Sequence, residues 1–307
     1  MDRVSTAGAY ANVLTNLMQA QQSQVTAGNQ VATQKKGTDL KTFASAADAL
    51  TSMNSVQARL QTYQDQNTII ANRLTTQDTA LNQVADSASA VRQAIASALA
   101  TGSAAGLTQT VSSELQSAVS GMNTQYNGEY LFSGGQVNTK PVTVTQLSDL
   151  SGPVPIGGFF QNGDYKIQNK LDDSTTVTTG VLASDIGTQL LNAFQALQNS
   201  PVGPFNGQLT DVQTTWLQGQ LAAWDQVGQG LTGVTAANGL VQQQVDAKKT
   251  SVAAQSTTLT GMLSSITDAD MTQAASQLQL AQMSVEAAAR VYQALQSSSL
   301  LNILPAA

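Results

Sequence analysis

Residues Met53–Ala98 read MNSVQARLQTYQDQNTIIANRLTTQDTALNQVADSASAVRQAIASA. One set of positions in this stretch recurs in alternating steps of three and four: Met53, Val56, Leu60, Tyr63, Asn67, Ile70, Leu74, Gln77, Leu81, Val84, Ala88, Val91, Ile95 and Ala98. This spacing places a single stripe along one face of an α-helix and is typical of coiled coils and helical bundles. At 1.5 Å per residue the helix is about 70 Å long, far longer than an average globular helix.

The apolar members of this stripe are expected to pack within the chain. The residues predicted for this intrachain bundle are Met53, Val56, Leu60, Ile70, Leu74, Leu81, Val84, Val91 and Ile95. Asn67 and Gln77 interrupt the stripe, and a polar residue at such a position often fixes register at some cost in stability. We therefore interpret both as structural residues rather than as ligand contacts.

Both ends of the chain repeat the pattern. The predicted seam residues are Ala11, Leu14, Met18 and Val25 near the N-terminus, and Met271, Ala274, Leu278, Ala281, Val285, Ala288, Tyr292 and Leu295 near the C-terminus. Between Met271 and Leu295 only Glu286 and Arg290 carry charge. A helix with one face in water usually carries many more charged residues, so a second partner is expected to cover the outer face.

Three further segments complete the predicted helices. The first helix breaks at KKGTDLKTF, and another runs over about 107–126 after the glycine-containing stretch TGSAAG. A helix is expected over 184–198 with Ser184 as its N-cap, and a long one over 209–266. The stripe then changes frame at TDAD, which predicts a junction between two helical sections.

Residues 129–182 are predicted to form a small β-rich insert. Their sequence alternates apolar and polar residues, and Asn162-Gly163 between two extended runs predicts a tight hairpin. The fold class is therefore mainly α, with long antiparallel coiled-coil helices from both chain ends. The predicted divisions are a terminal coiled-coil domain (1–35 plus 268–307), a helical-bundle domain (36–128 plus 183–267) and an outer domain (129–182).

The composition argues against several classes of function. Charged residues make up 10% of the chain, the net charge is −6 and the isoelectric point is about 4.5, so a nucleic-acid partner is not expected. The chain has no cysteine and no histidine, which removes disulfides, the commonest general base and most transition-metal ligand sets. We predict no catalytic residue, no cofactor and no metal.

The remaining charged and aromatic pairs have simple structural interpretations. Lys35-Lys36, Lys248-Lys249 and Asp172-Asp173 are interpreted as solvated charges, and Asp268 with Asp270 as N-terminal caps of the last helix rather than a metal site. Tyr130 and Phe132 are expected to pack against helices rather than to form an exposed recognition patch.

No stretch has the apolar length of a membrane span, and the first residues lack the apolar core of a signal peptide. We therefore expect that the chain does not insert into a membrane. If it leaves the cytoplasm, it is expected to do so by a route that needs no Sec signal.

Three segments resemble one protein family. The C-terminal run SSITDADMTQAASQLQLAQMSVEAAARVYQALQSSSLLNIL resembles the C-terminal signature of bacterial flagellins and their junction proteins, with Ile266, Asp268, Ala269, Asp270, Gln282 and Leu300-Leu301 at matching places. The stretch TTQDTALNQVADSASAVRQAIASALATG resembles the corresponding N-terminal region. The run NGEYLFSGGQVNTKPV, residues 127–142, resembles in particular the hook-associated proteins of the hook–filament junction.

The resemblance implies a structural role outside the cell, in the bacterial flagellum. In this family the terminal helices of many subunits pack into concentric tubes, so both faces of the last helix would be covered. The implied partners are flagellin, another hook-associated protein on the hook side, further copies of the chain and an export chaperone. The family leaves the cell unfolded through the flagellar type III channel.

Two alternatives stay open at this stage. The first is a flagellin, the filament subunit, with a reduced outer domain. The second is an enzyme that uses carboxylates such as Asp172 or Glu129, although no histidine, cysteine or glycine-rich phosphate loop supports it.

Overall fold

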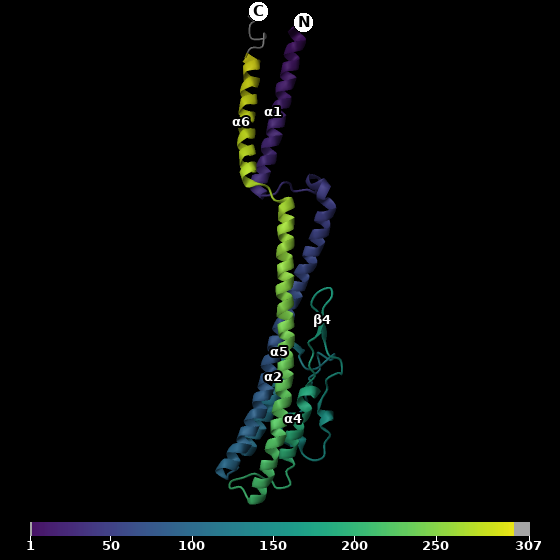
Figure 1. Ribbon diagram of the computed structural model, residues 1–307, viewed down its shortest axis with the longest axis vertical. Helices are drawn as coiled ribbons and strands as arrows, with labels where there is room; N and C mark the ends of the chain where they lie inside the picture. The colour runs from purple at the N-terminus through teal and green to yellow at the C-terminus, as the bar shows by residue number, and fades with distance from the viewer. Residues whose placement is uncertain (1, 298–307) are drawn as a thin grey trace, which may run out of the picture. The chain divides into compact units, whose positions relative to one another are not determined.

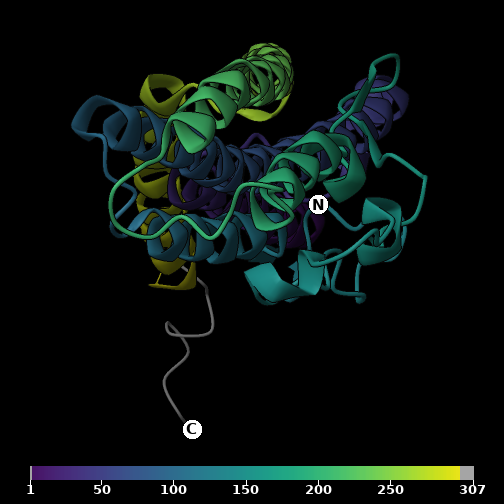
Figure 2. The ribbon, with the colours of Figure 1, turned by 90° about the horizontal axis from the view of Figure 1, so that it is seen from below.

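The computed structural model describes residues 2–297, which form long helices from both chain ends and a small irregular insert from the middle of the sequence (Figure 1; Figure 2 shows the same ribbon from below). The helices are α1 (Asp2–Thr33), α2 (Ala47–Thr101), α3 (Leu107–Met122), α4 (Ala183–Gln198), α5 (Asp211–Thr267) and α6 (Met271–Ser297). The strands are β1 (Gln125–Tyr126), β2 (Glu129–Tyr130), β3 (Gln168–Lys170) and β4 (Thr176–Thr178), and 3₁₀ turns span Leu40–Ala46, Leu147–Leu150 and Ile156–Phe159. The predicted fold class is confirmed. Leu300-Leu301 lie outside the described residues.

The described chain divides into two compact units. The first unit runs through Arg59 and resumes at Gln255, and the second runs from Leu60 to Ala254. Because α2 crosses the first boundary and α5 crosses the second, each of these helices contributes to both units. The three-part division made from the sequence has other boundaries and stays a prediction.

The second unit is a helical bundle built on the long stripe of α2. Of the stripe residues from Leu60 to Ala98, all are buried except the half-buried Tyr63. Those from Leu81 to Ala98 pack with residues of α3, α4 and α5 in a core whose largest member is Trp224, which meets Phe194 edge to face at a ring distance of 5.0 Å. Ile70 and Leu74 pack in a separate, smaller cluster with Leu171, Val177 and Val245. In the first unit, the stripe residues Met53 and Val56 are half-buried.

The two polar stripe residues attach the insert and α5 to α2. Asn67 is fully buried and its Nδ2 donates to the carbonyl oxygen of Leu171 at 3.0 Å. Gln77 Nε2 donates to the carbonyl oxygen of Thr179 at 3.1 Å and to Asn238 Oδ1 at 2.9 Å. Both therefore hold specific neighbours, which agrees with the structural interpretation made from the sequence.

The prediction of a tight hairpin at Asn162-Gly163 is wrong. The tight hairpin forms instead at Asn127-Gly128, where both residues have positive φ (53° and 84°) and connect β1 to β2. Asn162 has another role at the start of α4: its Oδ1 accepts the backbone N–H of Ser184 at 3.1 Å, and its Nδ2 donates to Ser184 Oγ. Ser184 is thus not the N-cap, because α4 already begins at Ala183.

The loop after β2 is anchored in the core. Leu131, Phe132 and Ser133 are buried, and the carbonyl oxygen of Phe132 accepts the N–H of Ala183 at 2.9 Å. Gly134 has φ +65°, and a Cβ there would lie 2.5 Å from the carbonyl oxygen of Gly163. The part of the 127–142 motif around these residues is therefore a structural anchor, and Phe132 packs as expected.

Candidate assembly surface on the terminal helices

The two terminal helices lie side by side and antiparallel, as Figure 1 shows. Their packed face on α6 holds the residues that the spacing predicts: Ala274 and Ala281 are buried, and Leu278, Val285, Ala288, Tyr292 and Leu295 are half-buried. Met271, the first residue of α6, is 39% exposed. The C-terminal stripe is thus the inner face of the pair.

The inner face of α1 is not the predicted stripe. Its buried and half-buried residues include Tyr10, Val13, Leu17, Ala20, Gln24, Ala27 and Val31. The predicted residues Ala11, Leu14, Met18 and Val25 lie one position further along and are all exposed. One residue corresponds to a rotation of about 100° around a helix, so the same spacing describes two adjacent faces. An assembly role for the exposed stripe stays a prediction.

The inner faces meet through small residues in one part of the pair and through aromatic residues in another. Near the middle of the pair, Ala27 and Ala281 are buried, and alanine allows two helices to approach closely. Further along, the rings of Tyr10 and Tyr292 meet edge to face at 6.2 Å. Tyr10 Oη also donates to the carbonyl oxygen of Leu295 at 2.6 Å, which fixes the register of the two helices.

Apolar side chains also cover outer parts of both helices. On α1, Leu14, Met18 and Val25 are 47%, 55% and 58% exposed, and together with Ala11 they form what we name the α1 outer stripe. On α6, the α6 outer stripe consists of Leu280, Met283 and Val291, which are 57%, 51% and 49% exposed. The sequence did not point to the α6 outer stripe, because the regular steps of three and four on that helix identify only its inner face.

The outer surface of α1 carries no charged side chain beyond Arg3. Between Arg3 and Lys35 the sequence contains no charged residue. Single exposed apolar residues are ordinary, whereas aligned ones without charged neighbours form the kind of apolar patch found at interaction sites.

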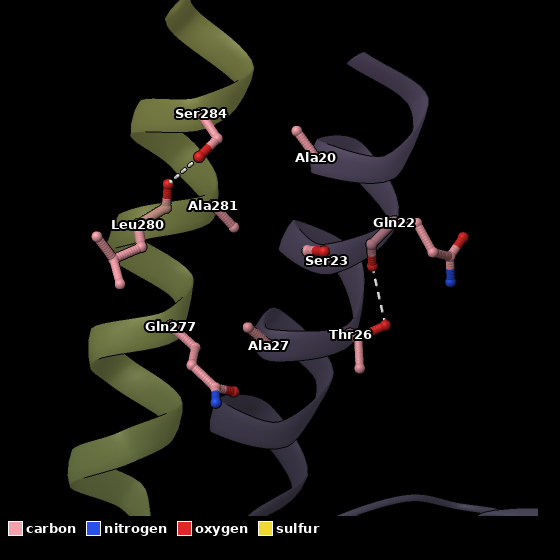
Figure 3. Close-up of a pocket in the computed structure, with 9 residues that line it drawn as sticks. All are labelled: Ala20, Gln22, Ser23, Thr26, Ala27, Gln277, Leu280, Ala281 and Ser284. Atoms are coloured by element: carbon pink, nitrogen blue, oxygen red, sulfur yellow. Dashed lines mark hydrogen bonds between the residues drawn. The ribbon is translucent and has the colours of Figure 1, made fainter. Parts of the chain in front are cut away.

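A shallow groove of about 430 Å³ lies between the two helices, and Figure 3 shows the residues that line it. Its lining consists of Ala20, Gln22, Ser23, Thr26 and Ala27 from α1 and Gln277, Leu280, Ala281 and Ser284 from α6. Two of the hydroxyl groups bond within their own helix: Thr26 Oγ1 donates to the carbonyl oxygen of Gln22, and Ser284 Oγ to that of Leu280. The groove thus has mostly small side chains and no charged residue among its lining, which suits helix packing rather than chemistry.

The chain segments leading out of α1 and into α6 are tied together. Lys36 N–H donates to the carbonyl oxygen of Thr267 at 2.8 Å, and Ala269 N–H to that of Gln34 at 2.9 Å. Lys35 pairs with Asp268 across this bridge, and Lys36 Nζ donates to the carbonyl oxygens of Ser265 and Ile266. Lys35 and Lys36 are exposed near the end of α1, as predicted, and in addition they hold these two segments together.

The two aspartates ahead of α6 have different roles. Asp270 Oδ1 accepts the N–H groups of Thr272 and Gln273 at 2.9 and 3.1 Å, as an N-cap does. Asp268 instead receives the Lys35 ammonium, which lowers the pKa of its carboxyl group. The cap prediction holds for Asp270 and is wrong for Asp268.

The carboxylates considered for an enzyme are engaged in ion pairs within the second unit. Asp172 accepts Lys248 Nζ at 2.6 Å, and this bond holds the pKa of Asp172 well below its usual range. Asp173 accepts the hydroxyl of Tyr63 at 2.8 Å, and Glu129 lies 3.7 Å from Arg73. The solvated interpretation holds for the exposed Asp173 but is wrong for Asp172 and Lys248, which are half-buried in their ion pair. Within residues 2–297, no group of three or more acidic residues is placed to hold a metal ion.

Two family models match the chain. The bacterial flagellin N-terminal helical region matches residues 4–137, and the bacterial flagellin C-terminal helical region matches residues 221–304. The chain belongs to the bacterial flagellin family. Members of this family build the flagellum, so the chain is a flagellar structural protein, and its exposed helix surfaces are to be understood in that setting.

Solved structures show the same flagellin-type fold. One is described as the structure of a putative flagellar hook-associated protein from Vibrio parahaemolyticus, with a TM-score of 0.61 and 17% identity over 74% of this chain and 100% of that one. Another is the crystal structure of Bacillus cereus FlgL, with a TM-score of 0.54 and 18% identity over 70% and 99%. No curated protein matches the chain in sequence. None of the described helices has the length and hydropathy needed to cross a membrane.

Proposed function

We propose that this flagellin-family chain is a hook-associated protein 3, the junction protein that joins the hook side of the flagellum to the flagellin filament. The observation that carries the proposal is the 127–142 run, which resembles that group in sequence, within a fold like those described as hook-associated protein and FlgL. The compact insert of residues 129–182 adds support, because a filament flagellin commonly presents a larger outer domain.

The proposed mechanism is mechanical. The α1 and α6 outer stripes contain no charged residue. They can therefore be buried against the terminal helices of neighbouring copies without leaving unpaired charges. Such contacts join different patches of successive subunits and therefore repeat around a helical layer. One edge of the layer meets flagellin and the other meets another hook-associated protein.

The same proposal covers the route out of the cell. The chain is exported unfolded through the flagellar type III channel, without a Sec signal, and a chaperone holds it before export. Terminal helices suit this route, since an isolated helix with a narrow alanine-rich stripe gains most of its stability from packing against partners.

A gene deletion distinguishes the junction role from the flagellin alternative. Without a junction protein, cells are expected to keep their hooks and to release flagellin subunits into the medium, because export continues while the filament has no base. Immunoblotting of the medium and electron microscopy of the cell surface measure this. A deletion strain that still carries full-length filaments contradicts the proposal. Loss of the major filament protein itself, with no flagellin in the medium, makes the chain a flagellin.

A further inference from the structure

Four asparagine–glycine pairs occur in the chain, at residues 127–128, 162–163, 206–207 and 238–239. Glycine has no Cβ, so no side chain of its own shields its backbone nitrogen from the asparagine before it. That nitrogen can attack the asparagine amide carbon, and asparagine is accordingly counted among the thermolabile residues. Because glycine follows the asparagine in all four pairs, the fold decides which pair reacts.

Two of the pairs are protected by hydrogen bonds. Asn238 lies inside α5, is only 3% exposed, and its Oδ1 accepts Gln77 Nε2 at 2.9 Å. Asn162 is half-buried with both side-chain atoms bonded to the next helix, and the attacking nitrogen of Gly163 donates to the carbonyl oxygen of Ser133 at 2.9 Å. These contacts must break before either asparagine can react.

The third pair is exposed but held in a turn. Asn127 and Gly128 connect β1 to β2, and both have positive φ. Closing a ring between the Asn127 side chain and the Gly128 nitrogen twists the peptide between them. The pairing of the two strands opposes that twist, so this pair is expected to react slowly.

The fourth pair has none of these restraints. Asn206 is exposed and lies outside the helices and strands, and neither its side chain nor the nitrogen of Gly207 bonds to any residue that the structure describes. No heavy atom lies within 4 Å of where a Cβ of Gly207 would be. The amide carbon and the attacking nitrogen are therefore free to meet.

We propose that Asn206 is a site of spontaneous deamidation. The Gly207 nitrogen loses its proton to hydroxide and attacks Asn206 Cγ, the Cγ–Nδ2 bond breaks, and ammonia leaves a cyclic imide. Water then opens the imide on one of its two sides. One opening gives aspartate, and the other gives isoaspartate, in which the backbone runs through the former side-chain carbon. The site does not depend on the proposed flagellar role.

Isoaspartate at this position would disturb a contact between two loops. The carbonyl oxygen of Gly207 accepts the N–H of Ala104 at 2.7 Å, and the N–H of Leu209 donates to the carbonyl oxygen of Gly102 at 2.8 Å. Isoaspartate lengthens the backbone by one atom directly before these bonds and adds a negative charge. The converted chain is therefore expected to melt at a lower temperature.

Ageing of the purified full-length chain tests the site. The chain is incubated in mildly alkaline buffer, folded or in urea, and digested at intervals. Mass spectrometry measures the conversion of each asparagine, and a protein isoaspartyl methyltransferase used as a reagent labels the isoaspartate product. Asn206→Gln is the control, because its side chain is exposed and the larger ring that glutamine needs closes far more slowly.

In the folded chain Asn206 should convert at least about tenfold faster than Asn162 and Asn238, which react only after local opening. In urea the four pairs should convert at rates within about threefold of one another, because the unfolded chain no longer protects any of them. A folded chain in which another of the four asparagines converts as fast as Asn206 overturns the proposal. The same order of rates in urea also overturns it, since the fold would then not select the site.

The melting temperature tests the consequence for the loops. Aged wild-type chain should melt at a lower temperature than aged Asn206→Gln, and methyltransferase labelling of the folded variant should be lost. Unchanged labelling of the variant would place the isoaspartate elsewhere and overturn the site. Equal melting temperatures after full conversion of Asn206 would overturn the effect on the loop contact.

Discussion

Asn67 and Gln77 show at the residue scale how a polar side chain selects the partners of an apolar stripe. Each is almost fully buried on α2, and each donates to a backbone carbonyl in the segment around β3 and β4. An apolar side chain at either position would leave that carbonyl without its donor. The sequence indicated that both residues are structural, because they interrupt an otherwise apolar stripe, but it could not indicate which segment they bind.

Replacing Asn67 by alanine should destabilise the second unit by about 1–3 kcal/mol, because the carbonyl oxygen of Leu171 loses its buried donor. Chemical denaturation monitored by circular dichroism measures the change. Asn72→Ala is the control, since Asn72 is exposed on the same helix and should change stability by less than about 0.5 kcal/mol. Equal effects of the two substitutions would contradict the anchoring role.

Asp172 should make stability depend on pH. The Lys248 ammonium lowers the folded-state pKa below the reference value of 3.8, so the ionised carboxylate stabilises the fold at neutral pH. That stabilisation is present above about pH 5 and is lost as the pH falls below 3.8 towards the folded pKa.

The measurement is the difference in unfolding free energy between wild type and Asp172→Asn at pH 7 and pH 3. The asparagine keeps an acceptor for the N–H groups of Ser174 and Thr175 while removing the charge. The difference should be larger at pH 7, and Lys248→Met should reduce its pH dependence. A difference that is constant across this range would show that the ion pair contributes nothing.

At the scale of elements, one dipeptide has two outcomes in this chain. Asn127-Gly128 forms the two-residue turn between β1 and β2, whereas Asn162-Gly163 lies in an irregular segment whose asparagine caps α4. The local sequence favours a hairpin at both places. The second was not predictable because its outcome depends on contacts with Gly134 and Ser184, which are distant in sequence.

The anchor after β2 should be sensitive to a single methyl group. Gly134→Ala combines a positive φ with a clash against the carbonyl oxygen of Gly163, and should cost more than about 2 kcal/mol. Gly128→Ala has a positive φ but open space, and should cost only about 1–2 kcal/mol. Thermal unfolding of both variants checks the order, and a reversed order would show that the 134–163 contact is not tight.

The terminal helices show why spacing alone identifies a helix but not its partner. On α1 the positions from Tyr10 to Val31 and those from Ala11 to Val25 both follow steps of three and four, and only the first set faces α6. Sequence patterning therefore predicted the helix and its junctions correctly. The choice of face depends on α6, where the Tyr292 ring meets Tyr10.

Across the whole molecule, two classes of surface are distinguished. The first holds one subunit together, and the second is proposed to join subunits. The inner faces of α1 and α6 and the core of the second unit belong to the first class. We propose that the α1 outer stripe belongs to the second, because its residues are exposed in the isolated chain and lie on the part of α1 that has no charged residue. Substitutions in the two classes should therefore have different consequences.

A double substitution of Leu14 and Met18 by aspartate should leave the isolated chain as stable as the wild type within about 0.5 kcal/mol, since both side chains are about half exposed. Its incorporation into flagella should be lost, because assembly would bury two unpaired carboxylates. Gln19→Asp, on an exposed face outside the outer stripe, is the control and should incorporate better. Wild-type incorporation of the double variant would remove the α1 outer stripe from the assembly surface.

The position of the chain in the flagellum distinguishes a junction protein from a filament subunit. Immunogold electron microscopy of intact flagellated cells, with an antibody against residues 140–182, measures that position. The account predicts one cluster of gold per flagellum, at the boundary between hook and filament. Gold along the whole filament would contradict the junction role and make the chain a flagellin, and unlabelled flagella despite confirmed expression and antibody access would contradict its place in the flagellum.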